Sequence, residues 1–174
     1  MLTAGVDGLD KFTGTEKGDV FKVGETLISS GYYDVDGSGE PDTFVNQYTS
    51  HLNSLDVLDG GAGKDTLNVE TEGAIATVTA NISNIETINL KSGSTVTFDT
   101  TTYTGVETLN VTKATTSATF LAADLTAAAT TDVNVSGITI DNRDISVKGG
   151  KNIVINDTKA GGDITIGDKI VVAG

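Results

Sequence analysis

The segments "DTLNV" at 65–69, "ETINL" at 86–90 and "ETLNV" at 107–111 recur at a spacing of 21 residues. Each reads acid, threonine, aliphatic, asparagine, aliphatic. The aliphatic residues alternate with polar ones, which is the two-residue period of a β-strand. A fixed period of about 20 residues indicates a solenoid, in which stacked turns bury side chains that one turn alone leaves exposed. We therefore predict an all-β parallel β-solenoid of the β-helix or β-roll kind, built from short strands.

The rest of the chain extends this pattern. Short β-branched runs separated by glycine, asparagine and aspartate are typical of strands joined by tight turns. They occur at 75–80, 95–98, 118–120, 133–135, 138–140, 145–147, 153–155, 164–166 and 170–172. The stretch "ATFLAADLTAAAT" at 118–130 is the one segment with helix-favouring composition, and it predicts one or two helical turns.

Two other folds fit parts of the pattern. The segment "ISNIETINL" has the aliphatic spacing of a leucine-rich repeat, although no helix-forming segment follows each strand. A β-sandwich also uses short strands and turns. The recurring asparagines leave two interpretations open, a hydrogen-bonded ladder along the solenoid or simple exposure to water between inward aliphatics. They are Asn68, Asn89, Asn110 and Asn134.

A nine-residue motif precedes the first of these strands. "GGAGKDTLN" at 60–68 matches the calcium-binding β-roll repeat G-G-x-G-x-D-x-aliphatic-x at every specified position. Degenerate copies follow one another at 5–13 and 14–22. Calcium takes six to eight oxygen ligands, and glycine turns expose their carbonyls to it without a steric penalty. The predicted calcium ligands are Asp10, Asp19 and Asp65 at the sixth positions, with Gly61 and Gly63 within the best copy and Asp56 and Asp59, which flank it, as weaker candidates.

An insertion at about 23–58 carries a second calcium signal. "DVDGSGEPD" at 34–42 matches the first half of an EF-hand-like loop. Its twelfth position is Val45 rather than Glu, so a complete EF-hand is excluded, and we expect a loop that shares the half-motif or contributes ligands to another site. The candidate ligands are the side chains of Asp34, Asp36 and Ser38, the carbonyl of Glu40, and Asp42 directly or through water.

Charge supports cation binding. The net charge is −13, and residues 1–65 carry 12 acids against 4 bases, whereas residues 66–174 carry 12 acids against 7 bases. An acidic surface repels nucleic acids and anionic membranes, and we predict neither nucleic-acid binding nor membrane insertion. The chain has no cysteine, so disulfides and thiolate metal sites are excluded. It begins and ends within its repeat pattern and opens without a secretory signal, so we expect a segment of a longer protein.

Several motifs together resemble a protein family. "FTGTEKGDVF", "LNSLDVLDGGAGKDTLNV" and "NISNIETINL…GVETLNV" are similar to bacterial surface-layer proteins of the repeats-in-toxin class, over roughly residues 2–112. The resemblance implies a Gram-negative protein, secreted by the type I route, that folds outside the cell in calcium. It implies self-assembly with copies of the parent protein into a surface array. Binding to lipopolysaccharide or another cell-surface glycan would use regions outside this segment.

On this basis we expect a structural protein with Ca²⁺ as its ion. Residues 1–58 would hold the degenerate repeats and the acidic loop, and residues 59–174 the solenoid turns, as one continuous unit. A calcium-dependent adhesin is the alternative, with Tyr32, Tyr33 and Tyr48 either reading a ligand or anchoring the insertion. A polysaccharide-active enzyme is the weakest interpretation, because His51 is the sole histidine and aromatics are 5% of the chain. We predict no catalysis.

Overall fold

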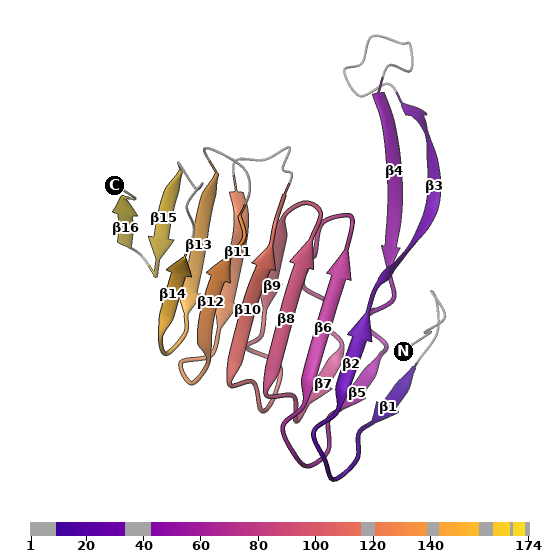
Figure 1. Ribbon diagram of the computed structural model, residues 1–174, viewed down its shortest axis with the longest axis vertical. Helices are drawn as coiled ribbons and strands as arrows, with labels where there is room; N and C mark the ends of the chain where they lie inside the picture. Colours follow the sequence, from indigo (N-terminus) through magenta and orange to yellow (C-terminus); the bar gives the residue numbers. More distant parts are fainter. Residues whose placement is uncertain are drawn as a thin grey trace.

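The computed structural model describes residues 10–33, 43–115, 121–138, 143–156, 162–167 and 169–172. Throughout these ranges the regular structure is β, and strands stack in parallel to form a β-solenoid (Figure 1). The predicted fold class is therefore confirmed. Leucine-rich repeat and β-sandwich are both wrong, since the described part has no helix per repeat and its stacked strands pair in parallel. No helix long and apolar enough to cross a membrane occurs in the described ranges.

A six-stranded parallel sheet runs along the solenoid in the order β14-β12-β10-β8-β6-β2. The predicted repeats are its central strands and pair without slip, Leu67 beside Ile88 and Ile88 beside Leu109. Hydrophobic patterning therefore sets the register, because a shift by one residue would turn every aliphatic side chain outward. The strands are β2 (Val20–Val23), β6 (Thr66–Thr71), β8 (Thr87–Ser92), β10 (Thr108–Lys113), β12 (Asp132–Ser136) and β14 (Ile153–Asn156).

Two further sheets close the solenoid. The first, in the order β1-β5-β7, is parallel and covers the earliest turns; its strands are β1 (Lys11–Thr13), β5 (Val57–Asp59) and β7 (Asn81–Ser83). The second has the order β16-β15-β13-β11-β9 and covers the later turns. Its strands are β9 (Val96–Asp99), β11 (Leu121–Ala127), β13 (Asp144–Gly149), β15 (Asp163–Ile166) and β16 (Lys169–Val172), of which β16 alone is antiparallel.

Two expectations about local structure are wrong. The predicted helical turns in 118–130 are replaced over 121–127 by β11, which pairs with β9 and β13. Ala122, Ala123 and Leu125 are buried there, so tertiary pairing overrides the helix propensity of alanine. The expected strand at 75–80 is reduced to one isolated bridge, between Ile75 and Val96.

The core is a continuous column of aliphatic side chains between the sheets. Residues of the repeated strands alternate strictly between buried and half-buried or exposed positions, and Leu67, Ile88, Leu109 and Val133 are fully buried. The asparagines lie on the outward side of the same strands. The side-chain amide of each later asparagine donates to the Oδ1 of the asparagine on the preceding strand, at 2.8 Å from Asn89 to Asn68, 2.8 Å from Asn110 to Asn89 and 2.9 Å from Asn134 to Asn110. Both interpretations of these residues therefore hold, because the ladder is also outward-facing.

An antiparallel hairpin interrupts the solenoid after its first turn. Among the described residues, strands β3 (Glu25–Tyr33) and β4 (Thr43–Ser50) pair only with each other, and they extend beyond the body of the molecule (Figure 1). The insertion at about 23–58, expected to be an acidic loop, thus contains two strands. The hairpin is held at its base, where the Glu25 carboxylate accepts hydrogen bonds from the N–H groups of Glu72 and Gly73.

Tyr103 provides a pH-dependent test of the core. Its hydroxyl donates to the Val78 carbonyl at 2.7 Å, and its ring packs edge-on against Phe98 with centroids 5.9 Å apart. Burial, aided by the nearby Asp99 carboxylate, raises the pKa of Tyr103 to about 12 from an ordinary value of 10.0. The raised pKa stabilises the fold below pH 10, and this contribution is lost as pH rises from about 10 to about 12.

We expect spectroscopic titration of the folded protein to show one phenolate that forms only near pH 12. Tyr103→Phe should remove that late component and lower the free energy of unfolding by about 1–2 kcal/mol. If the late component persisted in Tyr103→Phe, the assignment to this residue would be wrong.

Candidate metal site in the stacked glycine turns

Two glycine-rich turns stack directly on one another at one edge of the solenoid. Residues 14–19 connect β1 to β2, and residues 60–65 connect β5 to β6. The N–H of Gly14 donates to the Asp59 carbonyl at 2.7 Å, and the N–H of Ala62 donates to the Thr15 carbonyl at 3.1 Å. Backbone therefore packs against backbone, and the degenerate copy at 14–22 and the better copy at 60–68 are brought together as neighbours.

Glycine is required in this contact. Gly61 and Gly63 have φ values of 89° and 124°, which other residues rarely adopt. A side chain at Gly60 would place its Cβ 1.8 Å from the carbonyl oxygen of Asn84 in the following turn. The glycines of the motif thus permit the close approach of successive turns.

Asp19 and Asp65 end the two turns and meet there. One oxygen of Asp65, Oδ1, accepts a hydrogen bond from the N–H of Asp19 at 2.6 Å. The other, Oδ2, is buried and has no hydrogen-bond partner, and the residue as a whole is only 1% exposed. Asp19 uses its own Oδ2 to accept from the N–H and hydroxyl of Thr15, at 2.6 and 2.9 Å. The site therefore contains a buried carboxylate oxygen to which no group donates a hydrogen bond.

A related backbone-to-carboxylate contact joins Asp10 and Asp56, before β1 and β5, but here both oxygens of the accepting Asp56 have donors. The N–H of Asp10 donates to Asp56 Oδ1 at 3.2 Å, and the N–H of Asn53 donates to Asp56 Oδ2 at 2.8 Å. Asp56 is 4% exposed, and Asp10 Oδ2 is buried without a partner. Asp56, a weaker candidate from the sequence, precedes Asp65 by nine residues just as Asp10 precedes Asp19.

Asp59, in contrast, is engaged with the turn itself. Its Oδ1 accepts from the Asn84 side-chain amide at 2.8 Å and from the N–H of Gly61 at 3.1 Å. These two hydrogen bonds, led by that of Asn84, hold the pKa of Asp59 below its usual value. We interpret Asp59 as a turn-forming residue that orders Gly61, since its carboxylate already has donors.

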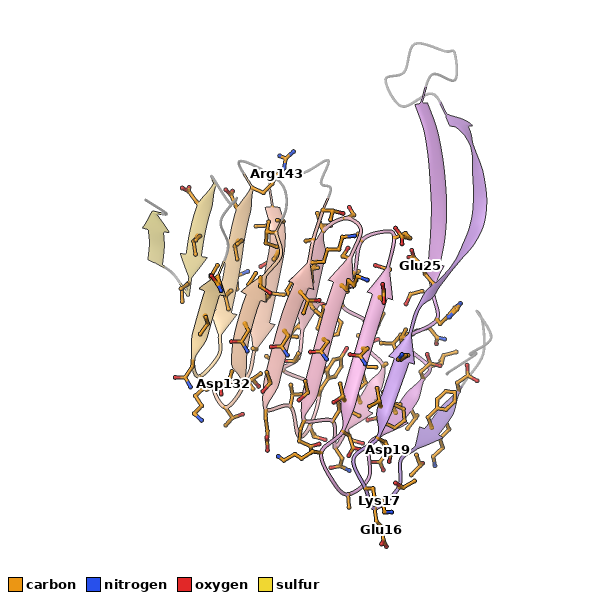
Figure 2. The ribbon with its side chains drawn as sticks, viewed as in Figure 1. Glu16, Lys17, Asp19, Glu25, Asp132 and Arg143 are labelled. Carbon is orange, nitrogen blue, oxygen red and sulfur yellow. The ribbon has the colours of Figure 1, made fainter. Side chains whose placement is uncertain are left out.

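A column of carboxylates continues from the glycine turns along the starts of the six-stranded sheet. Asp19, Asp65, Glu86 and Glu107 occupy equivalent places before β2, β6, β8 and β10. The N–H of Asp65 donates to Glu86 Oε2 at 2.7 Å. Lys64 Nζ donates a hydrogen bond to Glu107 Oε1 at 2.6 Å, and this hydrogen bond raises the pKa of Lys64. Figure 2 shows Asp19 beside the start of β2 and Asp132 at the start of β12, on the same side of the sheet.

The later turns of this edge are shorter and lack the glycine motif. Residues 84–86 connect β7 to β8, and residues 105–107 precede β10. Each begins with a residue of positive φ, 52° at Asn84 and 92° at Gly105. Of the turns before β2, β6, β8 and β10, the first two are therefore the long, glycine-rich ones.

The remaining predicted ligands cannot be placed. Asp34, Asp36, Ser38, Glu40 and Asp42 lie outside the described residues. Within the described ranges no group of three or more His, Cys, Asp or Glu side chains is arranged to hold a metal ion. A cation at Asp65 would therefore need backbone carbonyls of the turns as well as carboxylates, as the motif predicts.

Comparison with known proteins does not extend this assignment. No family model matches the chain, and neither the curated proteins nor the solved structures yield a match.

Proposed function

We propose that the chain is a calcium-stabilised β-solenoid segment of a secreted bacterial surface protein that assembles with its own copies into an extracellular, surface-layer-type array. The buried and unpartnered Oδ2 of Asp65 is the observation that supports this proposal most strongly. Burial of a carboxylate is costly unless the charge is paired or bound to a metal. Calcium is a hard cation that accepts carboxylate and carbonyl oxygens in irregular geometry, which suits an aspartate between stacked turns.

The rest of the molecule agrees with a structural role. Its net charge of −13 is concentrated toward the turns, where bound cations would relieve repulsion. Its core is a continuous aliphatic column, and its outward face carries the asparagine ladder. Glycan attachment of the parent protein is proposed to use regions outside this segment. Neither catalysis nor nucleic-acid binding is part of the proposal.

Thermal unfolding with and without millimolar calcium tests the proposal. An ion that binds only the folded state adds about 2.7 kcal/mol at a concentration one hundred times its Kd. For a chain of this size we expect a rise in Tm of about 5–10 °C. Magnesium is the control, since it keeps its water and demands octahedral geometry. An unchanged Tm in calcium, or an equal shift with magnesium, would contradict the calcium assignment.

A calcium-dependent adhesin is the second candidate, favoured by the hairpin that projects from the body (Figure 1). The hairpin strands include four of the nine aromatic residues of the chain, Tyr32, Tyr33, Phe44 and Tyr48. Attachment to cells or glycans in calcium, without self-association of the protein, would favour this function over an array.

A further inference from the structure

The six-stranded sheet ends in two strands with open edges. In the part of the chain that the structure describes, β2 pairs only with β6 and β14 pairs only with β12. Edge strands present unpaired N–H and C=O groups that can template pairing with another chain. Val20 on β2 and Val154 on β14 are 63% and 54% exposed, and they are two of the three large hydrophobic residues exposed in the described ranges.

The two edges are complementary in direction and in side-chain pattern. All six strands are parallel, so β14 of one copy can continue the sheet onto β2 of the next without reversal. Within one copy, Phe21 on β2 and Ile153 on β14 occupy equivalent register positions along the sheet. If β14 pairs with β2 of the next copy in the same register, Ile153 lies beside Phe21 and Ile155 beside Val23. Ile153 and Ile155 are only partly buried within one copy, so stacking would complete their burial.

Charge is complementary at the same joint. The carboxylate column runs from Asp19 through Asp65 and Glu86 to Glu107. The equivalent positions before β12 and β14 are Thr131 and Lys151. Lys151 is exposed, and its N–H donates to the Thr131 carbonyl at 2.7 Å. The column is therefore acidic at the β2 end and basic at the β14 end. Stacking would place Lys151 of one copy beside Asp19 of the next.

The β2 end is also hollowed. An open depression of about 260 Å³ is lined there by β1, the first glycine turn and β2, from Phe12 to Phe21. At the opposite end the two sheets differ: the six-stranded sheet ends in the parallel strand β14, whereas the sheet containing β15 ends in the antiparallel strand β16. The joint would therefore use the six-stranded sheet only.

From these observations we propose that copies of this chain stack head to tail, with the β14 edge of one copy paired in parallel with the β2 edge of the next. The joint is heterologous and leaves a free β2 edge and a free β14 edge on every oligomer, so it generates open filaments rather than closed dimers. This inference rests on the proposed self-assembly and names the surfaces that carry it.

Disulfide trapping tests the joint and its register. The chain has no cysteine, so introduced cysteines react only with one another. The register places Val20 of one copy directly opposite Asn152 of the next, both exposed and on the outward face. Adjacent strands lie about 4.8 Å apart, within the Cα separation that a disulfide spans. We expect a mixture of Val20→Cys and Asn152→Cys proteins in calcium to oxidise to a mixed dimer, and the double variant to form a ladder of longer oligomers.

The matched control is Val20→Cys mixed with Val154→Cys. These positions are two residues out of register, at a diagonal Cα separation of about 8 Å that a disulfide does not span. Equal cross-linking of this pair would show non-specific contact and overturn the proposal. So would Val20→Cys homodimers alone, which would indicate an isologous dimer. Absence of cross-links would assign the edges to another occupant, such as flanking residues of a longer parent chain, and would also overturn it.

The same samples separate this inference from the proposed function. Calcium-dependent stabilisation without cross-linking would reject the stacked joint and leave the calcium proposal intact. Register-specific cross-linking without a calcium-dependent shift in Tm would support the joint and reject the calcium site.

Discussion

Replacement of Asp65 with alanine is expected to remove most of the calcium-dependent stability of the protein. Asp65 supplies the buried oxygen without a donor, and Asp19 points its N–H at the other oxygen of the same carboxylate. The variant loses the proposed ligand and leaves the Asp19 N–H without its acceptor. In calcium we expect the free energy of unfolding to fall by about 3–4 kcal/mol, the sum of the ion's contribution and a buried hydrogen bond. Denaturant unfolding with and without calcium measures both parts.

Asp65→Asn separates the charge from the hydrogen bond. Asparagine keeps an oxygen that can accept from Asp19 but removes the negative charge. Without calcium this variant should be at least as stable as the unaltered protein, because an uncompensated buried charge is gone. In calcium it should be less stable than the unaltered protein. Asp132→Asn, at the start of β12 and outside the glycine turns, is the control, and its calcium response should be retained (Figure 2). A normal calcium titration in Asp65→Asn would refute the assignment.

The central solenoid could be predicted because its information is local and periodic. Leu67, Ile88 and Leu109 repeat at 21 residues, and their register in the sheet follows that spacing directly. β11 could not be predicted in this way. Its alanines suit a helix in isolation, and only pairing with β9 and β13 makes them a buried strand.

The candidate site was predicted only in part, since its contacts depend on the inserted hairpin. Asp10 and Asp56, like Asp19 and Asp65, are 46 residues apart because β3 and β4 intervene. The 21-residue period therefore does not reveal these contacts. The glycines identified Asp65, whereas Asp56 follows a segment without glycine and carried no motif beyond its nine-residue spacing. The acids of the later turns, Glu86 and Glu107, were visible as a repeat but not as a continuation of the same column.

Leu109→Ala is expected to produce the other large loss, by a mechanism independent of calcium. Leu109 lies on β10 in the middle of the six-stranded sheet, is 0% exposed, and sits between Ile88 and Val133. Truncation of a leucine in such a position removes its transfer free energy and leaves a cavity, at a cost of about 3–5 kcal/mol. The neighbouring strands β8 and β12 are held by backbone hydrogen bonds and have little freedom to move into the cavity. Thr108→Ala, one residue away and facing outward, should cost less than about 1 kcal/mol.

Combining Leu109→Ala with Asp65→Asn tests whether the two losses have separate causes. Asp65 immediately precedes β6 and Leu109 lies on β10, with β8 between them, so the two residues are roughly 12 Å apart, and no hydrogen bond joins their side chains. Their effects on the free energy of unfolding in calcium should therefore add within about 0.5 kcal/mol. Leu109→Ala alone should keep the full calcium-dependent increment, because the glycine turns and Asp65 are untouched. A calcium increment that shrinks in Leu109→Ala would mean that the ion acts through the packing of the whole solenoid rather than through the turns that hold it.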